Sequence, residues 1–275
     1  MCIPEEMNSL EGVSLSMRDG SILCCIESIS SEFKALLRRN LSSICHGANE
    51  AGTGRPMFCY ETTLDTLLVG YNKKKDKVRV GMIGELLAHV LILHLFDDFK
   101  SVSPYFNMEE KNIKKGFDLL LYSFSSSEVW ITEVKSGRLN SGKNSNQTAN
   151  ILLGRASRDL YTRLNEQESN YWRNAVNSAR VAVEDNRDYK EVILDILRDE
   201  GDLASEGTAS SDDNNVFLVA TLFADISDPV AESVPHDFYL NLRATDKFQN
   251  ELVFCIQKNT IEAVVDFLRE EAANA

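Results

Sequence analysis

Paired cysteines and a long apolar segment are both missing from this chain. Its six cysteines stand at positions 2, 24, 25, 45, 59 and 255, with no Cys-x-x-Cys pair and no regular spacing. This pattern indicates neither a zinc ribbon nor a disulfide framework. The longest apolar run, residues 86–96, contains two histidines and falls short of the roughly 20 residues that cross a bilayer. Residues 1–6 are acidic where a secretion signal begins with basic residues. We therefore expect a cytoplasmic protein with no membrane association.

Positive charge is also scarce, and it is unevenly distributed. The 29 lysines and arginines face 42 acidic residues, for a formal net charge of −13. DNA-binding proteins normally present basic surface to the phosphate backbone. Residues 111–163 hold nine basic and four acidic residues, whereas residues 184–213 hold eleven acidic and three basic residues. The acidic segment is a docking surface for a basic partner, a surface that discourages DNA binding until activation, or an ordinary solvated face. Tight affinity for DNA is expected to come largely from another chain.

The length of 275 residues and the 43% hydrophobic content suffice for a sizeable α/β protein. Residues 12–27 alternate as a hairpin does around Asp19-Gly20, and residues 31–45 have the spacing of an amphipathic helix. A loop is expected at 46–55, a polar loop at 136–147 and a long helical region at about 148–183. The apolar runs 216–223 and 252–256 are typical of buried strands, and Thr260 is placed to cap a C-terminal helix.

Two apolar runs in the middle of the chain carry the most informative residues. A serine cluster at 125–127 separates them, so we expect them to pair as a hairpin. With the turn centred between the first two serines, Asp118 lies opposite Glu133. Because strand side chains alternate between faces, Glu133 and Lys135 project from one face while Val134 turns into the core. Two carboxylates and an ammonium group then converge.

Converging carboxylates repel each other when ionised, and a divalent cation relieves the repulsion. The oxygens of Asp118 and Glu133 suit Mg²⁺, with Mn²⁺ as a possible substitute, better than Zn²⁺. Such an ion polarises a phosphate oxygen and activates water, while Lys135 stabilises the developing charge or orients the nucleophile. The pattern therefore predicts phosphodiester hydrolysis. An exposed hairpin with ordinary salt-bridged charges is the alternative, although an unpaired Asp118 on an apolar strand would cost about 1 to 3 kcal/mol.

A further carboxylate precedes the hairpin. Residues 78–96 are typical of a mostly apolar helix whose one acid is Glu85. A carboxylate on a buried helix needs a partner, which is either a metal ion with its water shell or an interior salt bridge.

These residues follow the order of a known set of motifs. Glu85, Asp118 and Glu133-Val134-Lys135 match the helix glutamate, Gly-x-Asp strand and Glu-x-Lys strand of the PD-(D/E)XK nuclease superfamily, which the chain resembles over roughly residues 78–163. More narrowly, the Gly-Glu helix, Gly-Phe-Asp strand and Glu-Val-Lys-Ser strand resemble those of the HamA family, the nuclease subunits of the Hachiman anti-phage defence system.

The resemblance implies a restriction-endonuclease-like fold, with a central mixed sheet flanked by helices, and Mg²⁺-dependent DNA cleavage. It also implies a complex with a HamB-like helicase subunit that restrains the nuclease until phage or damaged DNA is sensed. Residues 1–77 would then form an N-terminal α+β region packed on a nuclease domain, 78–275, with a helical insertion at about 148–200.

The expected site residues follow from the same resemblance. Glu85, Asp118, Glu133 and Lys135 would be catalytic, with Asp118, Glu133 and Val134 as metal ligands and Glu85 acting through a metal-bound water. Basic residues near the motifs are candidates for DNA contacts: Lys114, Lys115, Arg138, Lys143 and Arg155. A basic patch at residues 73–79 either touches phosphates or is a solvated loop. Related nucleases carry a glutamine and a tyrosine one turn apart after the lysine strand.

In this chain Gln147 is the corresponding glutamine, but Ile151 stands four residues later where the related nucleases have the tyrosine. Gln147 is therefore either a site residue or an N-terminal helix position.

The predicted function is a Mg²⁺-dependent deoxyribonuclease effector of anti-phage defence, controlled by a partner helicase. The alternatives are a stand-alone restriction-like or cyclic-nucleotide-activated nuclease, and a non-catalytic scaffold subunit with a nuclease fold.

Overall fold

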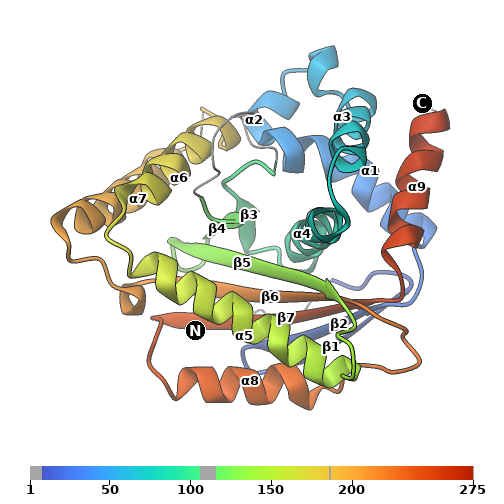
Figure 1. The fold of residues 1–275 in the computed structure, drawn as a ribbon. Coiled ribbons are helices and arrows are strands. Elements are labelled where there is room, and N and C mark those ends of the chain that lie inside the picture. Colours follow the sequence, from blue (N-terminus) through green and yellow to red (C-terminus); the bar gives the residue numbers. More distant parts are fainter. Residues whose placement is uncertain (1–7, 106–115, 186, 275) are drawn as a thin grey trace.

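The computed structural model describes residues 8–105, 116–185 and 187–274, which form a seven-stranded mixed sheet with helices on both faces (Figure 1). The strand order is β1-β2-β7-β6-β5-β4-β3. The strands are β1 (Val13–Arg18), β2 (Ser21–Ile26), β3 (Phe99–Ser101), β4 (Leu119–Ser123), β5 (Glu128–Arg138), β6 (Asn215–Phe223) and β7 (Asn250–Lys258). The α-helices are α1 (Ser31–His46), α2 (Ala48–Ala51), α3 (Tyr60–Asn72), α4 (Asp76–Leu95), α5 (Ser145–Leu164), α6 (Ser169–Ala182), α7 (Tyr189–Glu206), α8 (Ser233–Arg243) and α9 (Ile261–Asn274). The expected α/β class is confirmed, and the fold is consistent with a restriction-endonuclease-like core.

The N-terminal hairpin forms as the sequence predicts. β1 and β2 pair antiparallel with Arg18 opposite Ser21, so Asp19 and Gly20 make a two-residue turn, in which Asp19 has a left-handed φ of 50°. β2 then pairs in parallel with β7. Hydrogen bonds of the sheet therefore cross the domain boundary expected near residue 77, and that boundary stays a prediction.

The two apolar runs of the C-terminal half form adjacent parallel strands. β6 lies between β5 and β7, and each of its residues is buried. Its continuous apolar sequence is explained by this position, because a strand covered on both faces has no polar side. After β7, Oγ1 of Thr260 accepts a hydrogen bond from the backbone nitrogen of Ala263 at 3.4 Å, at the start of α9. Both strands and the C-terminal helix are confirmed.

Different helices cover the two faces of the sheet. α4 packs on β5 and β6 from one side, next to α1 and α9, and α5 packs on the same strands from the other side, next to α8. α6 and α7 pack against each other at one end of the molecule (Figure 1). On β5, Trp130 and Val134 belong to the core on the α4 side, and Ile131 belongs to the core on the α5 side. Glu133 and Lys135 therefore face α5.

Helix α4 lies at the centre of one hydrophobic core. Gly84 lets its backbone approach the sheet closely, because a Cβ there would lie 1.9 Å from Oγ of Ser136 on β5. By length and composition α4 is the one helix in the described parts of the chain that could cross a membrane, yet 61% of its apolar window is buried inside the fold. This burial is typical of a core helix, and the helix is longer than the apolar run 86–96.

Three regions differ from the sequence expectation. The helical stretch expected at 148–183 is divided into α5 and α6. Helix α5 ends next to Asn165, whose Nδ2 donates a hydrogen bond to the backbone oxygen of Tyr161 at 2.8 Å. This bond satisfies a carbonyl group of the last helical turn. The polar loop at 136–147 is shorter than expected, since β5 runs on to residue 138 and α5 begins at residue 145. The loop at 46–55 contains the four-residue helix α2.

Candidate active site

The β4–β5 hairpin brings the predicted acidic residues together. The register pairs Leu119 with Thr132, and the same register carried one residue further sets Asp118 opposite Glu133. Oδ2 of Asp118 accepts a hydrogen bond from the backbone nitrogen of Val134 at 2.9 Å. The hairpin and the opposition of the two carboxylates are confirmed, whereas their catalytic roles stay predictions.

Glu133 is a buried carboxylate held by two cations. The residue has no exposed surface. Nζ of Lys135 donates to its Oε1 at 2.6 Å, while Nη1 of Arg163 donates to Oε2 at 2.7 Å and Nη2 donates to Oε1 at 3.4 Å. Nζ of Lys135 also lies 3.2 Å from Oδ2 of Asp159 on α5. Lys135 is thus fixed between two carboxylates, on the same face as Glu133.

The charges in this cluster follow from burial and proximity. Burial raises the pKa of Glu133, and the nearby negative charge of Asp118 raises it further. Arg163 and Lys135 act in the opposite direction, because positive charges favour the ionised carboxylate. Burial lowers the pKa of Lys135, but nearby carboxylates, Glu133 foremost, outweigh it, and the pKa is raised. The pKa of Arg163 is raised in the same way, with Glu133 again outweighing burial. Both cations are therefore charged at neutral pH.

Glu85 comes from the layer on the other face of the sheet. It follows Gly84, the residue at which α4 is pressed against β5. Burial raises the pKa of Tyr105, and the negative charges of Glu85 and Asp118 raise it further. The Tyr105 hydroxyl donates to the backbone oxygen of Met82 on α4 at 2.7 Å. Glu85 and Asp118 are thus electrostatic neighbours of one tyrosine.

The residue types at this cluster suit a divalent cation, although their present pairing does not. Asp118 and Glu133 supply the hard oxygens that Mg²⁺ prefers. Val134 buries its side chain in the core on the α4 side and offers only its backbone. Both oxygens of Glu133 are engaged by Lys135 and Arg163. Within residues 8–105, 116–185 and 187–274, no group of three His, Cys, Asp or Glu side chains is placed to hold a metal ion. A cation therefore requires Glu133 to change partners.

Three of the five candidate DNA contacts receive little support or cannot be placed. Lys114 and Lys115 lie outside the described residues. Arg138, at the end of β5, pairs with Oδ2 of Asp76 at 2.5 Å and with Oε1 of Glu262 at 3.2 Å. Its guanidinium is therefore engaged by two carboxylates, and a phosphate would have to compete with them.

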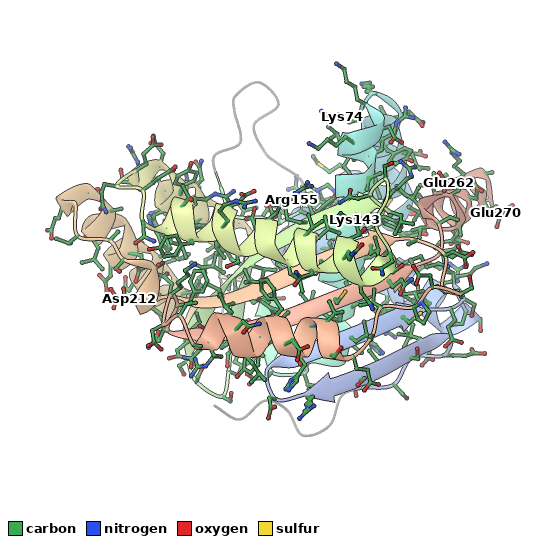
Figure 2. All side chains as sticks on the ribbon, turned by 60° about the horizontal axis from the view of Figure 1, so that its bottom comes forward. Lys74, Lys143, Arg155, Asp212, Glu262 and Glu270 are labelled. Atoms are coloured by element: carbon green, nitrogen blue, oxygen red, sulfur yellow. The ribbon has the colours of Figure 1, made fainter. Side chains whose placement is uncertain are left out.

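Lys143 and Arg155 remain the better placed candidates. Both are exposed, and Figure 2 shows Arg155 on α5, Lys143 in the loop before that helix, and Lys74 of the basic patch on the α3–α4 connection. Asp212 and Glu270 lie toward opposite ends of the molecule in the same view. In this view the three labelled basic side chains lie between Asp212 and Glu270.

Gln147 has a structural role. Its Oε1 accepts a hydrogen bond from the backbone nitrogen of Asn144 at 3.3 Å, and Oδ1 of Asn144 accepts one from the backbone nitrogen of Gln147 at 2.9 Å. This capping box satisfies two amide groups at the start of α5. The interpretation of Gln147 as an N-terminal helix position is confirmed.

Neither Asp159 nor Tyr105 was predicted from the sequence to lie at the site, and the pairing of Arg163 with Glu133 was not predicted either. Asp159 and Arg163 are one helical turn apart and flank Leu160, a member of the buried stripe of α5. That spacing is a usable signal, because charged residues beside a buried stripe lie at the edge of the face that meets the sheet. Nothing local to Tyr105 indicates its position.

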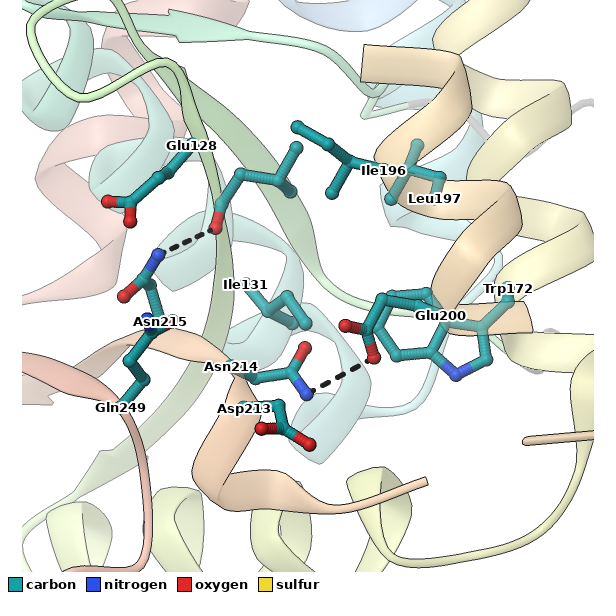
Figure 3. A pocket seen from close by; sticks show the side chains of 11 residues that line it. Glu128, Ile131, Trp172, Ile196, Leu197, Glu200, Asp213, Asn214, Asn215 and Gln249 are labelled. Atoms are coloured by element: carbon teal, nitrogen blue, oxygen red, sulfur yellow. Dashed lines mark hydrogen bonds between the residues drawn. The ribbon is translucent and has the colours of Figure 1, made fainter. Parts of the chain in front are cut away.

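A cavity of about 160 Å³ lies near the other end of the hairpin, between the sheet and α7. Figure 3 shows Glu200 beside the ring of Trp172, and Nδ2 of Asn214 donating to Oε2 of Glu200 at 3.4 Å. Burial raises the pKa of Glu200. The lining also includes Glu128 and Asp213 and contains no lysine or arginine among its described residues. This cavity does not suit a phosphodiester.

Comparison with known proteins agrees with the resemblance of the motifs. No curated protein matches the chain. A family model described as HamA matches residues 8–272, which include Glu85, Asp118, Glu133 and Lys135. Since the match covers nearly the whole chain, this protein belongs to the HamA family.

Proposed function

We propose that this protein is a Mg²⁺-dependent deoxyribonuclease, the effector of a cytoplasmic Hachiman anti-phage defence system, and that a partner helicase controls it. The observation that carries the proposal is the convergence of Asp118, Glu133 and Lys135 on one face of the β4–β5 hairpin. Membership of the HamA family supports the same reaction class.

Asp118, Glu133 and the backbone carbonyl of Val134 would hold the magnesium ion, for which Mn²⁺ is a possible substitute. When bound, the ion would polarise a phosphate oxygen and activate a water molecule. The hydrogen bond from the Val134 nitrogen orients the Asp118 carboxylate through Oδ2. Glu85 would act from α4 through a water molecule.

Lys135 would stabilise the negative charge that develops on the scissile phosphate. Its ammonium group is held by Glu133 at 2.6 Å and by Asp159 at 3.2 Å, and 26% of its side chain is exposed. A charge that is fixed before the reaction stabilises the transition state without reorganisation, and partial burial strengthens its field. The pairing therefore prepares Lys135 for this role.

The surface charge supports a division of labour with the helicase. Lys143 in the loop before α5 and Arg155 on α5 offer exposed positive charge, whereas most acidic residues of α7 offer exposed negative charge. With a net charge of −13, the free chain would meet DNA with unfavourable long-range electrostatics. A helicase that binds DNA would bring the strand to the site and supply most of the affinity.

A plasmid-cleavage assay tests the proposal. Wild-type protein and Asp118→Asn are incubated with supercoiled plasmid and Mg²⁺, with and without the helicase subunit and ATP, and with EDTA as a control. We expect cleavage that requires Mg²⁺, Asp118 and the helicase. Full cleavage by folded Asp118→Asn would contradict the metal site, and full cleavage without the helicase would favour a stand-alone nuclease.

A non-catalytic scaffold is the second candidate. The observation that favours it is that Lys135 and Arg163 already engage both oxygens of Glu133, so the carboxylate is satisfied without a cation. No cleavage in any combination, from a folded protein that binds the helicase, would support the scaffold.

A further inference from the structure

Arg163 joins three parts of the candidate site. From α5 its Nη1 donates to Oε2 of Glu133 at 2.7 Å and to the backbone oxygen of Gly116 at 3.3 Å. Its guanidinium carbon also lies 6.0 Å from the ring centroid of Phe117 and 5.7 Å from that of Tyr171. Arg163 therefore connects α5 both to the glutamate on β5 and to the segment that leads into β4.

A buried carboxylate needs a counter-charge in every state of the protein. Glu133 has no exposed surface, and leaving its charge uncompensated in the interior would be strongly unfavourable. The guanidinium engages Oε2 at 2.7 Å and Oε1 at 3.4 Å. A divalent cation would approach the same oxygens, and two positive groups cannot share them without repulsion.

We propose that Arg163 is the displaceable counter-ion of Glu133. In the absence of a divalent cation it pairs with the carboxylate and holds it in place. When a cation binds to Asp118 and Glu133, the guanidinium leaves Glu133. Lys135, which reaches Glu133 from the same strand, stays paired with Asp159. The inference rests on the proposed function in one respect, namely that Asp118 and Glu133 bind a divalent cation.

Two features fit displacement better than a permanent pair. Arg163 is 20% exposed at its side chain, whereas the Glu133 side chain is 1% exposed, so the guanidinium has a route to solvent and the carboxylate has none. The guanidinium also lies near the rings of Phe117 and Tyr171, and these cation–π contacts do not depend on the ion pair with Glu133. The arginine can move while the glutamate stays.

Binding of Mn²⁺ to the full chain without DNA tests the proposal, with free Mn²⁺ followed by electron paramagnetic resonance. The variants are Arg163→Gln, the matched control Arg158→Gln and Asp118→Asn. Arg158 lies on the same helix, is exposed and has the same charge. We expect Arg163→Gln to bind Mn²⁺ roughly tenfold more tightly than wild type, because a competing charge is removed. Arg158→Gln should bind like wild type, and Asp118→Asn should lose the site.

The outcomes separate this inference from the proposed function. If Arg163→Gln and Arg158→Gln bind Mn²⁺ with equal affinity and Asp118→Asn does not bind it, Arg163 is not a displaceable counter-ion, but the metal site is supported. Absence of Asp118-dependent binding in both wild type and Arg163→Gln overturns the metal site and the counter-ion together.

Thermal unfolding provides a second readout if Arg163→Gln is unstable. We expect the variant to melt at a lower temperature than wild type without Mn²⁺, and to recover a larger part of its stability when Mn²⁺ is added, because the cation replaces the lost charge. The melting temperature of Arg163→Lys without Mn²⁺ should lie between those of wild type and Arg163→Gln. A lower melting temperature with the same Mn²⁺ response as wild type would show a merely structural role and overturn the proposal.

Discussion

Gly84 on α4 and Ser136 on β5 are in direct contact. A Cβ added to Gly84 would lie 1.9 Å from Oγ of Ser136 and 2.5 Å from its Cβ. Their sequence neighbours are Glu85 and Lys135, so this contact fixes the helix of one predicted site residue on the strand of another. The glycine of the Gly-Glu motif is thereby explained by packing.

Gly84→Ala is predicted to destabilise the protein and to slow cleavage. The added methyl group would force α4 and β5 apart, and overpacking of this kind costs about 1 to 3 kcal/mol. Urea denaturation measures the loss of unfolding free energy. Gly81→Ala on the same helix is the control, since the nearest atom to its new Cβ would be 3.9 Å away. That variant should be neutral or stabilised by about 0.5 to 1 kcal/mol.

A double variant tests the cause of the Gly84→Ala effect. Ser136→Gly removes the side chain that the new methyl group would meet first, so it should restore part of the stability lost in Gly84→Ala. If the two substitutions are simply additive, the contact between residues 84 and 136 is not the origin of the loss.

Gln147 is predicted to matter for helix stability and not for catalysis. Gln147→Ala should lower the unfolding free energy by a few tenths of a kcal/mol, and Asn144→Ala, which removes the N-cap, by about 1 kcal/mol. Neither variant should change the rate of plasmid cleavage under conditions where it is folded. A large loss of cleavage by folded Gln147→Ala would restore Gln147 as a site residue.

His89 is predicted to make the protein sensitive to acid. It is 2% exposed on α4, and burial lowers its pKa to about 3, whereas an unfolded histidine has a pKa of about 6.5. Between these values the unfolded chain binds the additional proton, so stability is lost as the pH falls below about 6.5. From pH 7.5 to pH 5.5 this group should remove about 1.4 kcal/mol of unfolding free energy.

His89→Leu tests this pH dependence. The variant has no imidazole to protonate, so its unfolding free energy should fall less than that of wild type between the two pH values. Urea denaturation at each pH gives both numbers. An equal fall in the two proteins would assign the acid sensitivity to other groups.

The elements that local pattern defines were predictable. Two apolar runs separated by a serine cluster indicate the β4–β5 hairpin and its register, and the apolar runs at 216–223 and 252–256 mark buried strands. Helix α8 was missed; Pro235 lies in its first turn, where the absent N–H has no intrahelical partner. Arg163 was also missed as a partner of Glu133, because that pairing depends on how α5 lies across β5. Packing between distant elements has no local signature in the sequence.

Cleavage of plasmid by Lys135→Ala shows whether Lys135 belongs to a hydrolytic centre. The variant is compared with wild type and with Lys100→Ala, an exposed lysine on β3, in the presence of Mg²⁺, the helicase and ATP. The fold should survive because Arg163 still neutralises Glu133 before a cation binds, and circular dichroism of the metal-free protein checks this. We expect Lys135→Ala to cut at least about 100-fold more slowly than wild type, with Lys100→Ala unaffected. Cleavage at the wild-type rate by folded Lys135→Ala would exclude Lys135 from the hydrolytic centre.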